Sequence, residues 1–155
     1  MTREQTCCVT GHRDISTEKQ DLIKALLRRE VLKAISEGYT HFISGFAAGV
    51  DLIFAEIVAE LKREYPITLE AAIPYPGRMN TPDAAFQRLI KCCDVVRVHA
   101  DHYHKGCYMN RNRYIVDSAS RIIAVCDGRK SGGTAATMKY ANAVGCVIRK
   151  INLWN

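Results

Sequence analysis

The chain has 155 residues, of which 48% are hydrophobic and 25% charged, so it holds enough apolar material for the core of one domain. Its formal net charge of +6 suits an anionic partner such as a nucleotide or a nucleic acid. No run of about 20 apolar residues is present, and residues 1–6 lack the apolar middle of a signal peptide, so we expect no membrane span and a cytoplasmic location.

Predicted strands and helices alternate along the whole chain. The strands are short apolar runs rich in β-branched residues, whereas the helices repeat apolar residues at helical spacing. In chain order the predictions are a strand at 6–10, a helix at 16–38, a strand at 40–44, a helix at 50–65, a strand at 67–73, a loop at 74–82, a helix at 83–93, a strand at 95–99, a helix at 108–118, a strand at 121–126, a helix at 134–144 and a strand at 146–151.

The helix at 16–38 has Ser16 as its expected N-terminal cap and Gly38 as its expected C-terminal cap, and Pro66 ends the next helix. The alternation is typical of a parallel sheet that is covered by helices on both faces. We therefore expect one α/β domain over residues 1–155, a three-layer sandwich with a mostly parallel central sheet.

The cysteines do not form a recognisable disulfide or zinc pattern. Their number is odd and none are spaced as a C-x-x-C pair, so we expect reduced side chains packed as small hydrophobes. The seven are Cys7, Cys8, Cys92, Cys93, Cys107, Cys126 and Cys146. His102 and His104 lie near Cys107, but no second set of ligands stands at a zinc spacing, so no metal is expected.

Three loops follow predicted strands, at the sheet edge where open α/β sheets bind ligands. The first is TGHRD at residues 10–14, where Gly11 lets the backbone approach a ligand. His12 adds an imidazole, and Arg13 a guanidinium that could hold a phosphate through two hydrogen bonds. An ordinary strand-to-helix turn explains the loop equally well.

The second loop is SGFAAGVD at residues 44–51, where Gly45 and Gly49 lead from Ser44 into a helix whose first amides favour an anion. Asp51 could cap that helix or accept a hydrogen bond from a ribose hydroxyl. The spacing is G-x-x-x-G, so the dinucleotide fingerprint G-x-G-x-x-G is absent.

The third loop, DGRKSGGTAAT at residues 127–137, again joins a strand to a helix, and its alternative interpretation is a flexible loop tip. Gly132, Gly133 and Thr134 would offer amides and a hydroxyl to a phosphate. Three such loops on one sheet edge are a stronger indication than any one alone.

A further segment, RNRYIVD at residues 111–117, is predicted to be helical. Arg111 could reach an anion, and Asn112 could fix a loop or contact a base. Alternatively, Arg113 and Asp117 simply pair on the helix surface.

Taken together, these segments resemble the YpsA-like proteins of the SLOG superfamily of Rossmann-like domains. That superfamily also contains the DNA-processing protein DprA (Smf) and the LOG phosphoribohydrolases, which are called lysine decarboxylase-like. The resemblance runs from about residue 6 to 151 and rests on TGHR, SGFAAGVD, AAIPYPG, GCYMNRNRYIVD, RIIAVCDG and GGTAATMKYA.

The resemblance implies a Rossmann-like domain that binds a nucleotide or a nucleotide-derived ligand, such as ADP-ribose or an NAD-like molecule. It also implies a bacterial protein with a role in stress or regulatory physiology, and a homo-oligomer, with dimers common. No cofactor beyond the nucleotide is expected. The candidate ligand-binding residues are Gly11, His12, Arg13, Ser44, Gly45, Gly49, Asp51, Arg111, Asn112, Gly132, Gly133 and Thr134.

The sequence departs from the LOG hydrolases, which resemble it in other respects. Their PGGxGTxxE motif carries a glutamate at the glycosidic bond, whereas this chain has SGGTAATMKYA there and no acidic residue after Asp127. Glycoside cleavage ordinarily needs a pair of carboxylates. Asp51, Glu56 and Asp117 are the candidate catalytic carboxylates, and whether the protein is an enzyme stays open.

The similarity to DprA makes single-stranded DNA an alternative partner, which the positive charge would favour. Aromatic residues make up only 8% of the chain, and they do not alternate with basic residues as in stacking platforms. Tyr103, Tyr108 and Tyr114 are the best candidates for stacking on bases.

Overall fold

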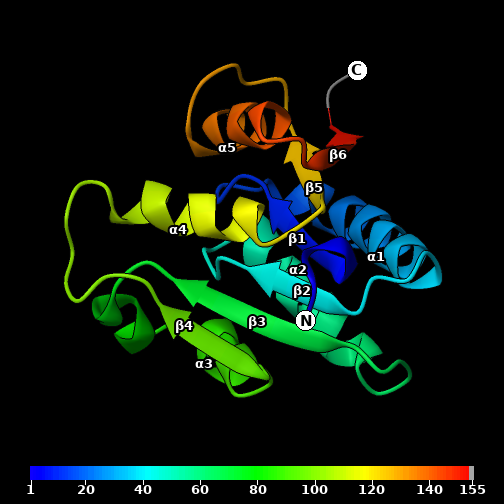
Figure 1. Cartoon of the computed structure of the whole chain (residues 1–155), viewed down its shortest axis with the longest axis horizontal. Helices are drawn as coiled ribbons and strands as arrows, with labels where there is room; N and C mark the ends of the chain where they lie inside the picture. The colour runs from blue at the N-terminus through cyan, green and yellow to red at the C-terminus, as the bar shows by residue number, and fades with distance from the viewer. Residues whose placement is uncertain (154–155) are drawn as a thin grey trace.

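The computed structural model describes residues 1–153, which form one six-stranded sheet between two layers of helices (Figure 1). All neighbouring strands are parallel, in the order β4-β3-β2-β1-β5-β6. The strands are β1 (Thr6–Thr10), β2 (His41–Ser44), β3 (Thr68–Ile73), β4 (Val95–Val98), β5 (Arg121–Cys126) and β6 (Val147–Asn152). The helices are α1 (Gln20–Ser36), α2 (Val50–Leu61), α3 (Ala84–Ile90), α4 (Cys107–Asp117) and α5 (Gly133–Ala143), with short 3₁₀ helices η1 (Arg3–Gln5), η2 (Thr17–Lys19) and η3 (Pro76–Asn80).

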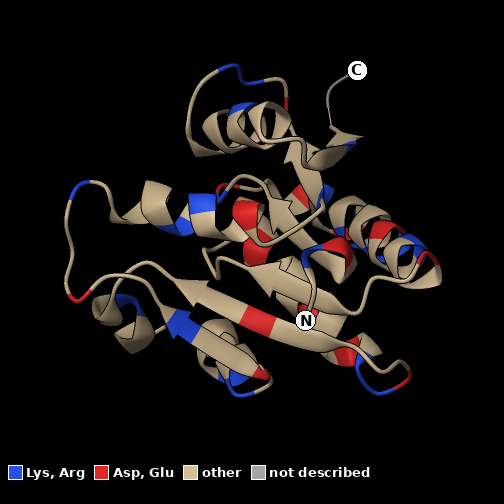
Figure 2. Cartoon of the chain, viewed as in Figure 1, with Lys and Arg blue, Asp and Glu red and all other residues tan. Residues whose placement is uncertain are grey.

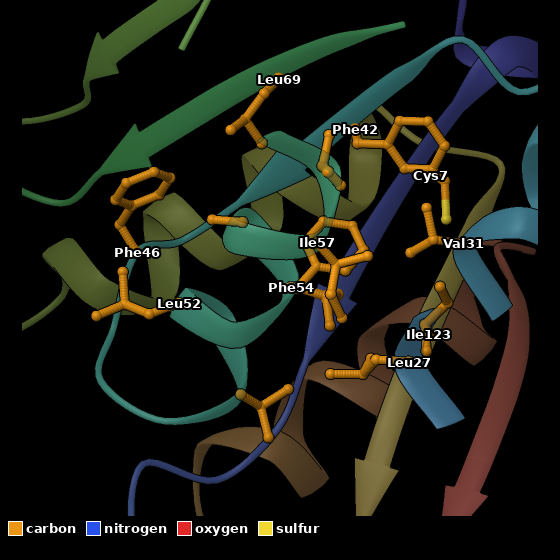
Figure 3. Packing of buried hydrophobic residues seen from close by; sticks show 14 of the residues in the cluster. Cys7, Leu27, Val31, Phe42, Phe46, Leu52, Phe54, Ile57, Leu69 and Ile123 are labelled. Carbon is orange, nitrogen blue, oxygen red and sulfur yellow. The ribbon is translucent and has the colours of Figure 1, made fainter. Parts of the chain in front are cut away.

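The two faces of the sheet bury different side chains, because successive residues of a strand point to opposite faces. Phe42 packs with α1, α2 and α3 in the larger core, which Figure 3 shows, whereas the next residue, Ile43, packs with α4 and α5. Cys7 and Cys8 divide in the same way on β1. This confirms the predicted three-layer, Rossmann-like α/β fold, with a sheet that is parallel throughout.

The ends of the first helix differ in how well they match the prediction. Its C-terminal cap is as expected, because Gly38 has a φ of 96° and Tyr39 N donates to Ala34 O at 3.0 Å, which is a Schellman arrangement. The N-terminal cap is not, since the Ser16 side chain makes no capping hydrogen bond and η2 precedes α1. The backbone carbonyl of Ser16 accepts from Lys19 N instead, at 3.0 Å.

Other predicted boundaries shift too, among them that of the helix predicted at 83–93, which ends at Ile90. The second helix, α2, ends at Leu61 rather than at residue 65, and the chain then tightens into a turn in which Glu64 N donates to Leu61 O. The predicted loop at 74–82 contains η3, which begins at Pro76.

The order of the strands reverses at one point of the sheet. From β1 to β4 each strand is added on the same side, and then β5 returns to pair with the other side of β1. Open α/β sheets bind ligands where the strand order reverses, outside the carboxyl ends of the strands. That point lies here between β1 and β5.

The cysteines are all free, as expected. Five of them are buried, whereas Cys92 and Cys93 are partly exposed. Within residues 1–153, no helix is both long enough and apolar enough to cross a bilayer.

Candidate functional site

A cavity of about 300 Å³ opens where the strand order reverses. It is bounded by the turn after β1, the start of α2, one side of α4 and the loop that leads into α5. The predicted ligand residues that border it are Gly11, His12, Arg13, Asp51, Arg111, Asn112, Gly132, Gly133 and Thr134. The predicted convergence of separate loops on one sheet edge is therefore present in the fold.

The other three predicted residues of SGFAAGVD lie behind the cavity wall. Ser44 Oγ donates to Asp51 O at 2.9 Å, and Gly45 O accepts a hydrogen bond from the buried Arg111. Gly49 has a φ of 83°, and a Cβ there would lie 2.4 Å from His12 O. The observed contacts of these residues hold the loop in place, and a phosphate contact by them stays a prediction.

The first backbone amide of α2 already has a hydrogen-bond acceptor within the protein. Val50 N donates to His12 O at 3.2 Å, which ties α2 to the turn after β1. A Cβ on Gly11 would lie 2.5 Å from Val50 Cβ, so the turn and the helix are in direct contact. The glycines of the two loops thus let two backbones approach one another.

Arg111 is the structural centre of this wall, with only 3% of its surface exposed. Its Nη1 donates to Gly45 O at 2.6 Å and to Ala72 O at 3.0 Å, and its Nε donates to Asn112 Oδ1 at 2.8 Å. Burial lowers the pKa of the guanidinium, and the nearby carboxylate of Asp51 opposes that effect. The result is a cation fixed in orientation at the edge of the cavity.

Asp51 faces the same cavity from the first turn of α2. Burial raises the pKa of its carboxyl from 3.8 to about 6, although Arg111, Arg13 and a hydrogen bond from Ala47 N act in the opposite direction. That hydrogen bond measures 3.2 Å to Oδ2. A carboxyl with such a pKa can hold or release a proton near neutral pH.

The loop before α5 is held against the turn after β1 by charged side chains. Arg129 donates through Nη2 to Asp14 Oδ1 at 3.0 Å and through Nε to Asp127 Oδ2 at 2.7 Å. His12 Nε2 lies 3.0 Å from Asp127 Oδ1. The hydrogen bond from Arg129 is the largest cause of the lowered pKa of Asp127.

Sequence reasoning missed these partners, although one pattern could have indicated them. Asp14 and Arg129 carry opposite charges in two loops that each follow a strand. Opposite charges at the carboxyl ends of neighbouring parallel strands can pair. That prediction requires knowing that β1 and β5 are neighbours in the sheet.

The start of α5 presents backbone amides to the cavity. No side chain among residues 1–153 caps this helix, and Gly132, with a φ of 99°, turns the chain into it. Gly132, Gly133 and Thr134 all border the cavity. The first amides of a helix carry partial positive charge, so this end of α5 favours an anion.

Two of the three candidate catalytic carboxylates lie elsewhere. Glu56 Oε2 pairs with Arg88 Nη2 at 2.6 Å, because it stands on a different side of α2 from Asp51. Asp117 ends α4 and accepts a hydrogen bond from Tyr140 at 2.7 Å. Of the three, Asp51 alone borders the cavity.

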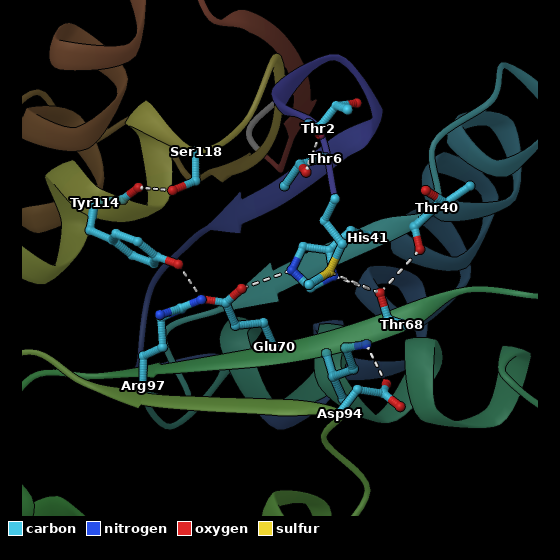
Figure 4. Close-up of polar contacts among 12 residues, drawn as sticks. Thr2, Thr6, Thr40, His41, Thr68, Glu70, Asp94, Arg97, Tyr114 and Ser118 are labelled. Carbon is cyan, nitrogen blue, oxygen red and sulfur yellow. Dashed lines mark hydrogen bonds and ion pairs between the residues drawn. The ribbon is translucent and has the colours of Figure 1, made fainter.

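Tyr114, a candidate for stacking, belongs to a buried polar network instead (Figure 4). Its hydroxyl donates to Glu70 Oε2, and Glu70 Oε1 lies 2.8 Å from His41 Nε2. Burial and the hydrogen bond to Glu70 raise the pKa of Tyr114. This residue therefore joins α4 to β2 and β3.

The charges on the rest of the molecule are mixed, with basic residues in the loops before α4 and α5 (Figure 2).

The chain is similar to two UPF0398 proteins. It is 27% identical over 140 residues to a UPF0398 protein of Ligilactobacillus salivarius, a match that covers 81% of this chain and 76% of the relative. A UPF0398 protein of Oceanobacillus iheyensis is also 27% identical, over 139 residues, with the same coverage.

Two solved structures share the fold. One is DNA processing protein A from Helicobacter pylori, whose structure was described for its single-stranded DNA binding mode; the TM-score is 0.67 and the identity 17%. The alignment covers 96% of this chain but only 65% of that one, so this chain spans just under two thirds of its length. The other is TM1055, a structural genomics target, with a TM-score of 0.58, 19% identity, and 93% and 72% of the two chains covered.

A family model settles the relationship that the sequence motifs suggested. It is YpsA, described as the YspA SLOG family, and it matches residues 7–148. These residues include all of β1 except its first residue, both sides of the cavity and the paired start of β6. The chain belongs to the YspA SLOG family.

Proposed function

We propose that this protein binds a nucleotide or a nucleotide-derived anion in the cavity between β1 and β5. The observation that carries the proposal is the convergence of Arg13, Arg111 and the uncapped start of α5 on one cavity. The guanidinium groups of Arg13 and Arg111, together with the backbone amides at the start of α5, favour a phosphate over a neutral ligand.

The parts of a nucleotide fit different walls. The phosphate would lie against Gly133 and Thr134, with Arg13 free to move toward it because its side chain is exposed. Asp51 would accept a hydrogen bond from a ribose hydroxyl. A volume of about 300 Å³ is at the lower end of small-molecule sites, so a ligand such as ADP-ribose or NAD would extend beyond the cavity.

A thermal-shift panel of AMP, ADP, ATP, NAD and ADP-ribose tests this proposal. A ligand present at about 100 times its Kd stabilises the fold by about 2.7 kcal/mol, which raises the Tm of a domain of this size by roughly 5–10 °C. We expect Arg13→Ala to reduce the shift at least severalfold, since it removes one exposed cation from the cavity rim.

Arg28→Ala is the matched control, because Arg28 is an exposed arginine that pairs with Glu60 away from the cavity. It should keep the full shift. If no nucleotide raises the Tm, and native mass spectrometry finds none bound to the purified protein, the proposal is wrong.

A second candidate function is cleavage of the bound nucleotide, for instance at its glycosidic bond. It is favoured by Asp51, with its pKa of about 6, and by His12, which borders the same cavity and pairs with Asp127. Such groups can supply and accept protons in a hydrolysis. Chromatography of the nucleotides after incubation tests it: products should form with the natural chain and be absent with Asp51→Asn, which should keep much of the binding.

Single-stranded DNA is the third candidate, and the likeness to DNA processing protein A supports it only through the shared fold.

A further inference from the structure

Three tyrosines from separate segments meet beside the cavity. Tyr75 follows β3, Tyr103 lies in the loop between β4 and α4, and Tyr108 is in the first turn of α4. The ring centroids of Tyr75 and Tyr103 are 5.4 Å apart, and those of Tyr75 and Tyr108 are 6.1 Å apart. Both pairs meet edge to face, with interplanar angles of 77° and 72°. We call these three residues the tyrosine cluster.

The tyrosine cluster begins at the cavity wall. The Arg13 guanidinium carbon lies 5.1 Å from the centroid of the Tyr108 ring, and that of Arg111 lies 5.6 Å from it. Both arginines border the cavity. Two cations at the cavity are thus followed by three aromatic rings in contact, although these residues are scattered in the sequence.

The outer end of the cluster is open to a ligand. Tyr103 is 60% exposed, which is more than any other aromatic residue within residues 1–153. Its loop also carries Lys105, which is exposed beside it in the sequence. Burying a tyrosine ring is favourable, so an exposed ring joined edge to face with a second one offers a surface on which a planar group can stack.

We propose that the tyrosine cluster is a base-stacking subsite for single-stranded nucleic acid, with one phosphate of the strand in the adjoining cavity. The proposal rests on the proposed function, because it takes the phosphate site as its starting point. The small cavity leaves the rest of a longer ligand outside, and Tyr108 lies against two arginines that border the cavity. Basic grooves combined with aromatic rings are the usual means of holding single strands, whereas a duplex keeps its base faces covered.

Fluorescence anisotropy with a labelled deoxythymidine oligomer of about 12 nucleotides tests the subsite. Removal of a stacking ring weakens binding by roughly 5- to 100-fold per base, so Tyr103→Ala should lose affinity within this range. Tyr103→Phe keeps the ring and should stay within about twofold of the natural chain. An unlabelled duplex of the same length should compete poorly.

Tyr140→Ala is the matched control. Tyr140 also has an arginine over its ring, Arg113 at 5.4 Å, but it lies in the last turns of α5, away from the cavity. Its loss should leave the affinity for the oligomer unchanged. Tyr103 is largely exposed and packs only edge to face on Tyr75, so its replacement should lower the Tm by no more than a few degrees, and that measurement excludes a folding defect as the cause.

Thymidine monophosphate separates this proposal from the proposed function. Its binding should depend on Arg13 but not on Tyr103. If Tyr103→Ala binds the oligomer as tightly as the natural chain does, or if the duplex binds equally well, the subsite is refuted while the phosphate site stands. If Tyr103→Phe loses as much as Tyr103→Ala, stacking is likewise refuted. If neither the oligomer nor any nucleotide binds, the proposed function itself fails.

Discussion

At the scale of single residues, Asp51 is the side chain whose environment changes its chemistry most. It was predicted from its place in the first turn of a helix, where an acid complements the helix dipole. The fold adds burial, which raises the pKa of the carboxyl to about 6 despite two neighbouring arginines. The ionised carboxylate of Asp51 therefore lowers the free energy of unfolding of the protein at neutral pH.

We predict that Asp51→Asn stabilises the protein at neutral pH. The folded-state pKa of about 6 exceeds the ordinary value of 3.8, so the folded state binds more protons between these values. Stability then falls as pH rises through this window, and the loss persists above it. Asn cannot ionise, so it should raise the free energy of unfolding by on the order of 1–3 kcal/mol at pH 7.

Urea unfolding of both proteins at about pH 4 and about pH 7 measures this difference. The gain should fall to roughly a fifth at the lower pH, because Asp51 is protonated in the folded protein and, with its ordinary pKa of 3.8, only partly ionised in the unfolded chain. An equal gain at both values would contradict the assignment of the effect to ionisation.

Other residue-level features were partly predictable. Arg111 was expected in the pocket because its segment resembles the family's, and it borders the cavity. Its hydrogen bonds to Gly45 O and Ala72 O were not, since they join three elements that only the fold brings together. The same holds for the hydrogen bonds of Arg129 to two separate loops.

At the scale of elements, the alternation of strands and helices was predicted correctly because apolar spacing is a local property. The strand at 121–126 matches β5 in full. The ends were less predictable where a side chain could cap but the backbone does so instead, as at Ser16. Of these elements, α5 matters most for the proposed phosphate site, because its uncapped start borders the cavity.

Two glycines with similar backbones separate stability from binding at this scale. Gly132 has a φ of 99° and Gly38 a φ of 96°, and a Cβ on either would meet nothing within 4 Å. Alanine is strained in this region, so Gly132→Ala and Gly38→Ala should each cost about 1–3 kcal/mol of stability. Only Gly132→Ala should also weaken nucleotide binding, because it changes the entry to α5.

Thermal denaturation measures both effects when it is done with and without a nucleotide that raises the Tm in the panel described above. Gly38→Ala serves as the control for strain alone, since Gly38 lies between α1 and the start of β2, at the edge of the sheet opposite the cavity, and does not border it. Equal nucleotide affinities in the two variants would show that the start of α5 does not hold the phosphate.

At the scale of the whole molecule, the parallel three-layer architecture was predictable but the strand order was not. Alternating elements indicate a parallel sheet. They do not tell on which side of β1 the chain will later place β5, and this pairing joins Cys7 to Arg121 in register. The exact walls of the cavity follow from that choice, which explains why its loops were predicted and their mutual contacts were not.

The buried thiols give a probe of global unfolding. Five cysteines distributed over the sheet and α4 are buried, and burial raises the pKa of Cys146 to about 11, which keeps its reactive thiolate scarce. In pulsed alkylation across a urea gradient, we predict that the five buried thiols become labelled together at the unfolding midpoint. Cys92, which is partly exposed, should react earlier.

Mass spectrometry of the labelled peptides locates each thiol. Labelling of Cys107 well below the midpoint would contradict a single cooperative transition, and would indicate that the start of α4 opens on its own.

The return of β5 to β1 also has a consequence for biosynthesis. A ribosome completes β1 to β4 first, and the free side of β1 must wait for residues 121–126, roughly 115 residues later, on the order of 10 s at ordinary elongation rates. During that interval the nascent half-sheet carries an unpaired edge that can attach to another chain. The same late segments supply one wall of the cavity, so a nucleotide can assist folding only after nearly the entire chain has been made.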